Sequence, residues 1–465
     1  MWVDRVRDHG SSVLVAGLSS AFGVTLLQVS DAIAAIVAVD DTTGSSGSAA
    51  VMLQLASAVF IVIAVYVGAV VTTNTFATII AGRTGTIALM RLLGSTASAQ
   101  RAAVSREGLW VGVIGGGLGL LAGTAVTWIA LSAVEAIGAI TVPAFALVSP
   151  VLAAPIVAVI VTTWLASWVG SRPVLGVSPM QATGAAQDKS YEETVSRRSR
   201  NVVAVIAFVL GIGLLVGGVV VGLVTPAGVL IGVAGGALSF AGLAFGAHLV
   251  IPRALRVVGR LFGGGATARL AAENAVRYPE RTSRNMIGVV IGVTLVTMFT
   301  VALSSFAALM ERVTDADPAA YSGADDVLLA ITAVFAALTG FSALIAAVGL
   351  VNNLSLSVLQ RTRELGLLRA LGLTAGQVRR MVVLESAQLT VTAVLLGLAL
   401  GTFYGWAGAQ SMFGSLDGGQ FVTPVLPLGL VVALAVCAAG LTAISSVVAA
   451  GKATRVTPVA ALAAI

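Results

Sequence analysis

The sequence predicts an all-α polytopic membrane protein with about ten transmembrane helices, arranged as two parallel four-helix half-units separated by two extra helices. Three observations predict this class. Hydrophobic residues make up 58% of the chain and charged residues only 10%, whereas soluble domains carry about a quarter charged residues. Apolar runs near the ~20 residues that span a bilayer follow one another along the chain. Residues 74–107 are also repeated at residues 352–385.

Ten apolar runs are predicted to be helices, because backbone inside hydrocarbon must satisfy its own hydrogen bonds. In order, they are residues 12–36, 51–82, 108–134, 149–170, 201–224, 228–251, 285–310, 328–359, 384–408 and 426–450. No small-residue cleavage site follows the first run, so it is predicted to stay as a helix rather than act as a signal peptide. The glycine-rich stretch 112–123 is predicted to pack helices closely, and Cys437 to be a small packed side chain.

The basic residues indicate the topology. In the ten-helix arrangement every Lys and Arg except Arg312 falls on one side of the membrane, as the positive-inside rule requires. Both termini are therefore predicted to be cytoplasmic, in the plasma membrane of a bacterium. The net charge of +6 follows from this topology, so we expect no nucleic-acid partner. The outer loops are short, hold little that could fold and include no extracellular domain. A tight outer turn is expected near Pro226.

The repeat divides the chain into two equivalent halves. Twelve residues are identical at an offset of 278. Residues 1–183 are predicted to form the first half with spans 1–4, and residues 285–465 the second half with spans 7–10. Residues 184–284 between them hold a linker, spans 5 and 6 and a cytosolic amphipathic helix at 265–284. Two extra crossings restore the orientation of the chain, so the halves run parallel rather than inverted.

The strongest candidate site is the second copy of the repeated segment, on the predicted cytosolic side. Its pattern is helical up to Leu371, and Gly372 is predicted to end that helix. Thr374 is predicted to cap a new helix that runs through Glu385 into span 9. The result is a short helical hairpin at the membrane surface. Its arginines either dock a partner protein or only hold the topology and contact lipid phosphates.

The first copy predicts an equivalent hairpin that leads into span 3. The break is expected at Gly94, with Ser95 or Thr96 as the cap of the following helix. Its sequence is degenerate, because Gly85 and Thr86 stand where the second copy has an Arg-Glu pair. The two hairpins are therefore not expected to be equivalent.

The second copy resembles the FtsX/MacB-type permease domain of ABC transporters. Residues 361–372 match that family's motif R-x-R-E-[ILV]-[AG]-[ILV]-[LM]-[RK]-A-[LIM]-G, and Pro179 and Pro458 match its closing S/T-P motif. The ten-span layout resembles the BceB-like subgroup without its large extracellular domain. The resemblance implies a set of ATPase-coupling residues, namely Arg361, Arg363, Glu364, Leu365, Arg369, Gly372 and Gln377 in the second copy and Arg83, Arg91 and Gly94 in the first. Glu107 and Glu385 are predicted to be a structural pair of positions, each pairing with nearby arginines.

The resemblance implies the permease subunit of an ABC transporter that exports or extracts an amphipathic substrate: a lipid, a lipopeptide or an antimicrobial peptide. The chain has no phosphate-binding loop of the form G-x-x-x-x-G-K-[ST], so we expect no enzymatic activity in it. ATP and Mg are expected to be bound by a partner ATPase, two subunits per permease. His9 and His248 match no metal-ligand spacing, so no metal or cofactor is expected in this chain.

Two other functions remain open from the sequence. The first is a non-transporting mechanotransmission subunit that regulates an outer cell-wall hydrolase or sensor partner. The second is an ATPase-independent secondary transporter, which would show broken helices with polar residues at the midplane. Beside the ATPase, the expected partners are the lipid bilayer and a lipoprotein or small membrane protein at the outer face.

Overall fold

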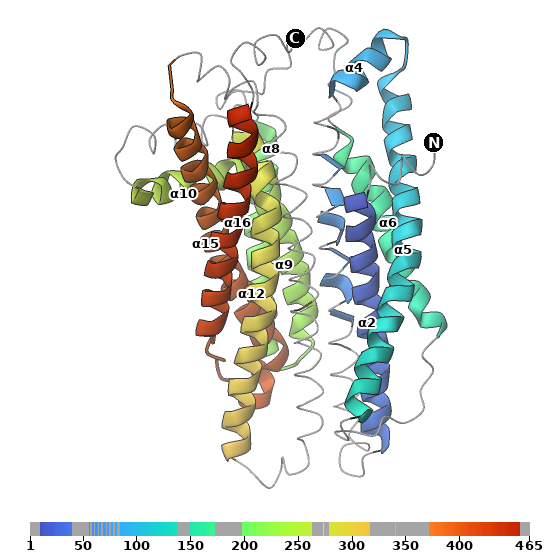
Figure 1. Ribbon diagram of the computed structural model, residues 1–465. Helices are drawn as coiled ribbons and strands as arrows, with labels where there is room; N and C mark the ends of the chain where they lie inside the picture. Colours follow the sequence, from blue (N-terminus) through green and yellow to red (C-terminus); the bar gives the residue numbers. More distant parts are fainter. Residues whose placement is uncertain are drawn as a thin grey trace.

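The computed structural model is a bundle of long helices (Figure 1). It describes residues 10–39, isolated residues between 55 and 80, residues 84–136, 149–172, 198–262, 279–316 and 372–455, and the single residues 273 and 340. Every regular element in these ranges is a helix. Seven helices in the described ranges are long and apolar enough to cross a membrane. The prediction of an all-α polytopic membrane protein is confirmed.

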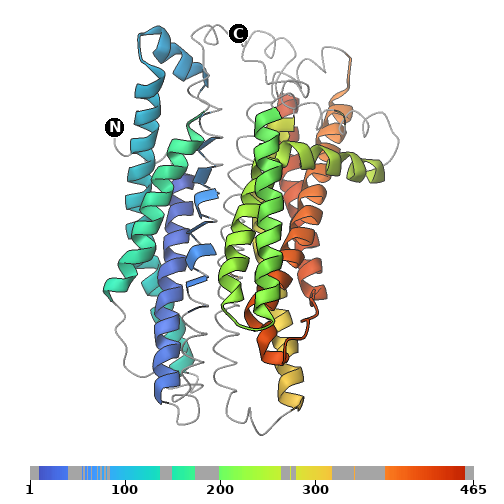
Figure 2. The same ribbon diagram turned by 180° about the vertical axis from the view of Figure 1, so that it is seen from behind.

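The helices gather into two groups that lie side by side in both views (Figures 1 and 2). The first group holds α2 (Gly10–Val39), α4 (Thr84–Leu92), α5 (Ala97–Ala136) and α6 (Ala153–Gly170), with η1 (Pro150–Leu152) before α6. The second group holds α8 (Arg198–Gly222), α9 (Gly228–Phe245), α10 (Ala247–Gly259), η4 (Arg260–Phe262), α12 (Pro279–Ala316), α15 (Ala375–Phe413), η5 (Gly414–Asp417) and α16 (Leu428–Arg455).

Most of the ten predicted spans coincide with these helices. The seven long apolar helices correspond to the first, third to seventh and ninth predicted runs. The tenth run lies in α16. The second run is described only at isolated residues, which include a short apolar helix at Ile61–Val70. The eighth run, residues 328–359, lies outside the described residues apart from residue 340.

Close approach between glycines and a neighbouring backbone holds α5 against α2. A methyl group added at Gly119 would lie 2.6 Å from the carbonyl oxygen of Gly17 and 2.7 Å from the amide nitrogen of Ala21, too short for van der Waals contact. In the second group Gly397 of α15, which lies 278 residues after Gly119, meets the Cγ1 of Val293 on α12 at 2.6 Å in the same test. The predicted packing role of the stretch 112–123 is confirmed.

The pair α8 and α9 forms a tight antiparallel hairpin between the halves. Its turn is closed by hydrogen bonds from the Gly228 amide to the Thr225 carbonyl (3.1 Å) and from the Val229 amide to the Pro226 carbonyl (3.2 Å). The predicted turn near Pro226 is confirmed.

The sixth predicted span is shorter than the sequence indicated. The hydrophobic run was expected to continue to residue 251, but α9 ends at Phe245 and the chain bends at Gly246 into α10. Both views show α10 running crosswise to the long helices (Figures 1 and 2). The helix predicted at 265–284 lies mostly outside the described residues. Its last part is the beginning of α12, which opens at Pro279, a residue favoured in the first turn of a helix.

One side chain of the second predicted span joins that span to the second helix group. The Tyr66 hydroxyl donates to the carbonyl oxygen of Ala237 on α9 (2.8 Å). Its ring meets Phe240 edge to face, with the ring centroids 6.4 Å apart, and Phe240 meets Tyr404 of α15 at 6.2 Å. The main core therefore continues from α2 through this span into α9, α12 and α15.

The loop between α15 and α16 is folded, contrary to the prediction for the outer loops. The side-chain oxygen of Gln410 accepts from the Val422 amide (2.6 Å), and its amide donates to the Gln420 carbonyl (3.1 Å). The Trp406 indole donates to the Val422 carbonyl (2.7 Å). The prediction was wrong because side chains of α15, not residues of the loop itself, supply the partners. Cys437 is exposed rather than packed as predicted.

Candidate functional site: two helical hairpins and an apolar cavity

The first hairpin joins α4 to α5 through a glycine turn. The Gly94 amide donates to the Arg91 carbonyl (3.1 Å) and the Ser95 amide to the Met90 carbonyl (3.0 Å), the pattern of a Schellman helix end. Gly94 has a φ of 94°, which side chains with a Cβ rarely adopt. The Thr96 hydroxyl accepts from the Ala99 amide (3.2 Å). The predicted break at Gly94 is confirmed, and Thr96 rather than Ser95 caps α5.

The second hairpin ends in a reciprocal cap at the start of α15. Gly372 has a φ of 99°. The Thr374 hydroxyl accepts from the Gln377 amide (3.3 Å), while the Gln377 side-chain oxygen accepts from the Thr374 amide (2.9 Å). This capping box satisfies backbone donors that a helix start leaves open. The predicted turn at Gly372 and cap at Thr374 are confirmed, and Gln377 proves to shape the turn itself.

The first hairpin and the described part of the second, from Gly372 onward, occupy one end of the molecule. Figure 1 shows α4 and the first turns of α5 and α15 at the top, and Figure 2 shows the same from behind. We call this end the hairpin end. Each hairpin leads without interruption into a long helix, α5 with 40 residues and α15 with 39.

Six of the ten predicted coupling residues lie outside the described residues. These are Arg83, Arg361, Arg363, Glu364, Leu365 and Arg369, and their role stays a prediction. Among the described ones, Arg91 is half-buried in the last turn of α4. Glu107 is half-buried and Glu385 is only 1% exposed. The two glutamates thus differ in burial, and their pairing with arginines stays a prediction.

The first hairpin presents an apolar surface to its surroundings. Ile87 and Ala88 of α4 are buried against Ile80, whereas Leu93 in the turn is 78% exposed. The same surface carries Leu89, Met90 and Leu92, which are all exposed. Contiguous exposed apolar side chains at the end of a helix are typical of a protein contact surface. The charges of this hairpin were predicted from the sequence, whereas its exposed apolar side chains were not.

Arg101 fastens the first hairpin to α6. Its Nε and Nη2 atoms donate to the carbonyl oxygen of Trp168 at 3.3 and 3.0 Å, and its guanidinium lies 3.9 Å from the centre of the Trp168 ring. A cation near the C-terminal carbonyls of a helix is also favoured by the helix dipole. At the offset of 278 residues, Ser446 stands in α16 where the first half has Trp168.

Substituting Arg101→Gln is therefore expected to destabilise the first helix group. The contact combines two charged hydrogen bonds with a cation–π interaction at an exposed site, which together contribute about 1 kcal/mol. A loss of that size lowers Tm by roughly 2–4 °C in a protein of this class. Thermal unfolding of the purified protein in detergent measures it. Arg106→Gln removes an exposed arginine of α5 that bonds the Ala102 carbonyl of its own helix, and an equal shift in that control would contradict the latch.

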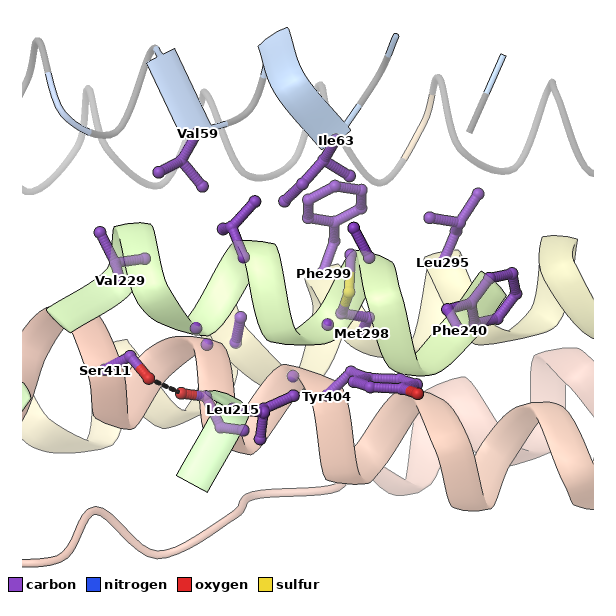
Figure 3. Close-up of a pocket in the computed structure, with 18 of the residues that line it drawn as sticks. Val59, Ile63, Leu215, Val229, Phe240, Leu295, Met298, Phe299, Tyr404 and Ser411 are labelled. Atoms are coloured by element: carbon purple, nitrogen blue, oxygen red, sulfur yellow. Dashed lines mark hydrogen bonds between the residues drawn. The ribbon is translucent and has the colours of Figure 1, made fainter. Parts of the chain in front are cut away.

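An apolar cavity of about 140 Å³ lies between the second predicted span and the second helix group. Figure 3 shows Val59 and Ile63 on one side, pointing towards Val229, Met298 and Phe299 on the other. A cavity of similar size lined by aliphatic and aromatic side chains holds a benzene-sized guest in other proteins. The cavity therefore fits an alkyl segment or a ring.

Three hydroxyl groups near the cavity are hydrogen-bonded, whereas the buried Thr294 hydroxyl in its lining has no partner among the described residues. The Tyr404 hydroxyl and the Ser239 hydroxyl are 2.9 Å apart and share a hydrogen bond, and the Tyr66 hydroxyl bonds Ala237 as described. Within the described ranges, no three His, Cys, Asp or Glu side chains gather where they could hold a metal.

Comparison with known proteins identifies the family. The family described as FtsX-like permease C-terminal matches residues 58–179 and, a second time, residues 336–455. These two stretches make up more than half of the chain, and they begin at the offset of the sequence repeat. The chain belongs to this family. The resemblance on the motif at residues 361–372 is confirmed, and the first hairpin and the start of α15 both lie inside the matched stretches of the permease.

Three relatives agree with this assignment. The permease is 34% identical over 90 residues to the uncharacterized ABC transporter permease YknZ of Bacillus subtilis. This alignment covers 19% of this chain and 22% of the relative. It is 27% identical over 129 residues to the ABC transporter permease YtrF of Bacillus subtilis, covering 26% of this chain and 29% of the relative. It is 34% identical over 73 residues to the macrolide export ATP-binding/permease protein MacB of Chlorobaculum tepidum, covering 14% and 11%. In these matches the chain spans less than a third of each relative.

Proposed function

We propose that this permease is the membrane subunit of an ABC transporter that exports or extracts an amphipathic substrate, such as a lipid, a lipopeptide or an antimicrobial peptide. ATP hydrolysis resides in a separate partner, with two ATPase subunits per permease and with ATP and Mg bound by them. The hairpin end faces the cytoplasm of a bacterium, together with both termini. The halves that act together are residues 1–183 and 285–465.

The observation that carries the proposal is the pair of hairpins at one end of the molecule. Each joins a sharp glycine turn to a membrane-length helix that begins at a defined cap. The first adds exposed apolar side chains, including Leu89 and Leu93, to the half-buried Arg91. A partner that moves these hairpins moves the helices attached to them, since the chain between is one continuous helix in each case.

The apolar cavity supports the class of substrate. Its lining comes from the second predicted span on one side and from α8, α9, α12 and α15 on the other. Movement of the hairpin helix α15 therefore changes the shape of a site lined by apolar side chains, which suits an acyl chain or an apolar side chain of a peptide. A small hydrophilic ion would lose its hydration there without gaining polar partners.

Charge reversal in the second hairpin tests the proposal. The permease is expressed with candidate ABC ATPases and purified, as wild type and as the variant Arg363→Glu/Glu364→Arg/Arg369→Glu. The wild type is expected to retain two ATPase chains, and the variant less than a tenth of that amount, because truncated or reversed charge pairs in an interface cost about 2–5 kcal/mol. Arg172→Glu, an exposed arginine at the end of α6, serves as the control and is expected to retain the ATPase.

Two results would end the proposal. If no candidate ATPase binds the wild type, the permease works without one. If the ATPase binds equally well to the charge-reversal variant, the second hairpin is not the coupling site. Once a complex is in hand, ATP hydrolysis measured with added lipids, lipopeptides and membrane-active peptides identifies the substrate class, which is expected to stimulate the rate.

A further inference from the structure

The helix α10 carries three separate faces. At about 100° per residue, the buried side chains Ile251, Leu255 and Val258 fall within an arc of about 60°. The exposed arginines Arg253, Arg256 and Arg260 fall within a second arc of about 60°. The exposed apolar side chains Val250, Val257 and Leu261, the last in η4, share a third arc of about 40°. Their burial and exposure follow the same division.

The buried face fixes α10 to the bundle. It packs against α12 and α15, and the His248 Nε2 atom lies 2.8 Å from the Asn201 side-chain oxygen in the first turns of α8. The remaining two faces point away from these helices. One of them is basic and the other apolar, so the exposed part of α10 has the character of a surface-bound amphipathic helix.

The position of α10 places these faces at the membrane surface. The preceding helix α9 is one of the seven that can cross the bilayer, and α10 begins two residues after it ends. The chain then runs crosswise to the long helices (Figures 1 and 2), so that α10 lies along the plane of a bilayer that α9 crosses. Val257 is 64% exposed and Leu261 78%, and insertion into the interface would cover such side chains.

We propose that α10 is a binding site for anionic phospholipid, with the arginine face on the headgroup phosphates and the apolar face among the acyl chains. Three arginines on one stripe match a negatively charged lipid surface, and the adjacent apolar stripe matches its hydrocarbon edge. A soluble anion would use only the first of these faces. The proposal depends on α9 crossing the membrane and is independent of the ATPase partner.

Native mass spectrometry of the purified permease tests the site. The protein in detergent is titrated with phosphatidylglycerol and with phosphatidylcholine of the same acyl chains. The wild type is expected to bind phosphatidylglycerol at least tenfold more tightly. The variant Arg253→Gln/Arg256→Gln/Arg260→Gln is expected to lose about tenfold or more of that affinity, since each basic residue near an anionic surface contributes up to about fivefold. The three Arg→Lys replacements together are expected to keep most of it.

A matched control removes the same charge elsewhere. Arg106→Gln/Arg379→Gln/Arg380→Gln takes three exposed arginines from α5 and α15 and is expected to stay within twofold of the wild type. Inorganic phosphate is expected not to displace phosphatidylglycerol. The variant Val257→Ser/Leu261→Ser is expected to lower the affinity for both phosphatidylglycerol and phosphatidylcholine.

The proposal is overturned if the α10 triple Gln variant binds phosphatidylglycerol as the wild type does, or if the control loses as much. Displacement by phosphate alone would show a site for a free anion. Loss of a co-purified ATPase with unchanged lipid binding would assign the arginines to a protein contact instead. Failure of the ATPase to bind the wild type bears on the proposed function and leaves the lipid measurement unaffected.

Discussion

Replacing Gly372 by Val is expected to uncouple the permease from its ATPase while leaving the membrane helices folded. The φ of 99° at Gly372 lies where a β-branched residue is strongly disfavoured. Relieving a strain on the order of 1–3 kcal/mol would redirect the segment that precedes α15. We expect ATP hydrolysis stimulated by the permease to fall by roughly tenfold or more, in proportion to that energy. The rate is measured with the purified complex.

Gly376→Val is the matched control for this experiment. Gly376 lies in the first turn of α15, where an added Cβ meets nothing within 4 Å, and Val is a better helix former than Gly. Its activity is expected to equal the wild type. Gly94→Val breaks the corresponding turn of the first hairpin, and we expect a smaller loss because that copy lacks the Arg-Glu pair. Equal activity of the variants at positions 372 and 376 would show that the turn geometry has no part in coupling.

Replacing Gly119 by Leu is expected to separate α2 from α5 and to abolish the stable fold of the first helix group. The first atom of the new side chain would already lie 2.6 Å from the Gly17 carbonyl oxygen, so the two backbones must move apart. Overpacking of this kind costs about 3 kcal/mol or more when backbone rather than a flexible side chain blocks the site. The yield of monodisperse protein and its thermal unfolding in detergent report the loss.

Gly117 provides the control two residues away on the same helix. An added Cβ there meets nothing within 4 Å, and Gly117→Leu is expected to fold as the wild type. Gly397→Leu in α15 is expected to repeat the effect of Gly119→Leu, with Gly408→Leu as its control, since Gly408 also faces open space. Equal stability of the variants at positions 119 and 117 would refute the close packing of α2 and α5.

Local rules predicted the hairpins from sequence because their geometry depends on neighbouring residues. Gly94 and Gly372 each follow a helical pattern and each take a positive φ. Thr96 and Thr374 each bond an amide three residues later. The transmembrane helices could be predicted equally well, since the length and composition of an apolar run decide whether it can span a bilayer. Hydrophobicity alone placed seven of them among the described residues.

Features that depend on partners far along the chain were missed. The bond between Arg101 and Trp168 joins residues that are 67 apart, and nothing near either residue indicates the other. The fold of the loop between α15 and α16 rests on Gln410, a polar side chain within an apolar helix that donates to a carbonyl oxygen ten residues later. The end of α9 at Phe245 was missed because the apolar run continues through Gly246 into the buried face of α10. The composition of the sequence therefore does not change at the point where the chain changes direction.

The unbroken length of α5 and α15 has a mechanical consequence. At about 1.5 Å per residue, 40 and 39 residues make rods of about 60 Å, twice the ~30 Å thickness of the hydrocarbon layer. Neither helix contains a proline, the commonest cause of a kink. A rod of this length acts as a lever when its base is moved. A tilt of about 5° at its base sweeps the far tip through about 5 Å, which follows from its length alone.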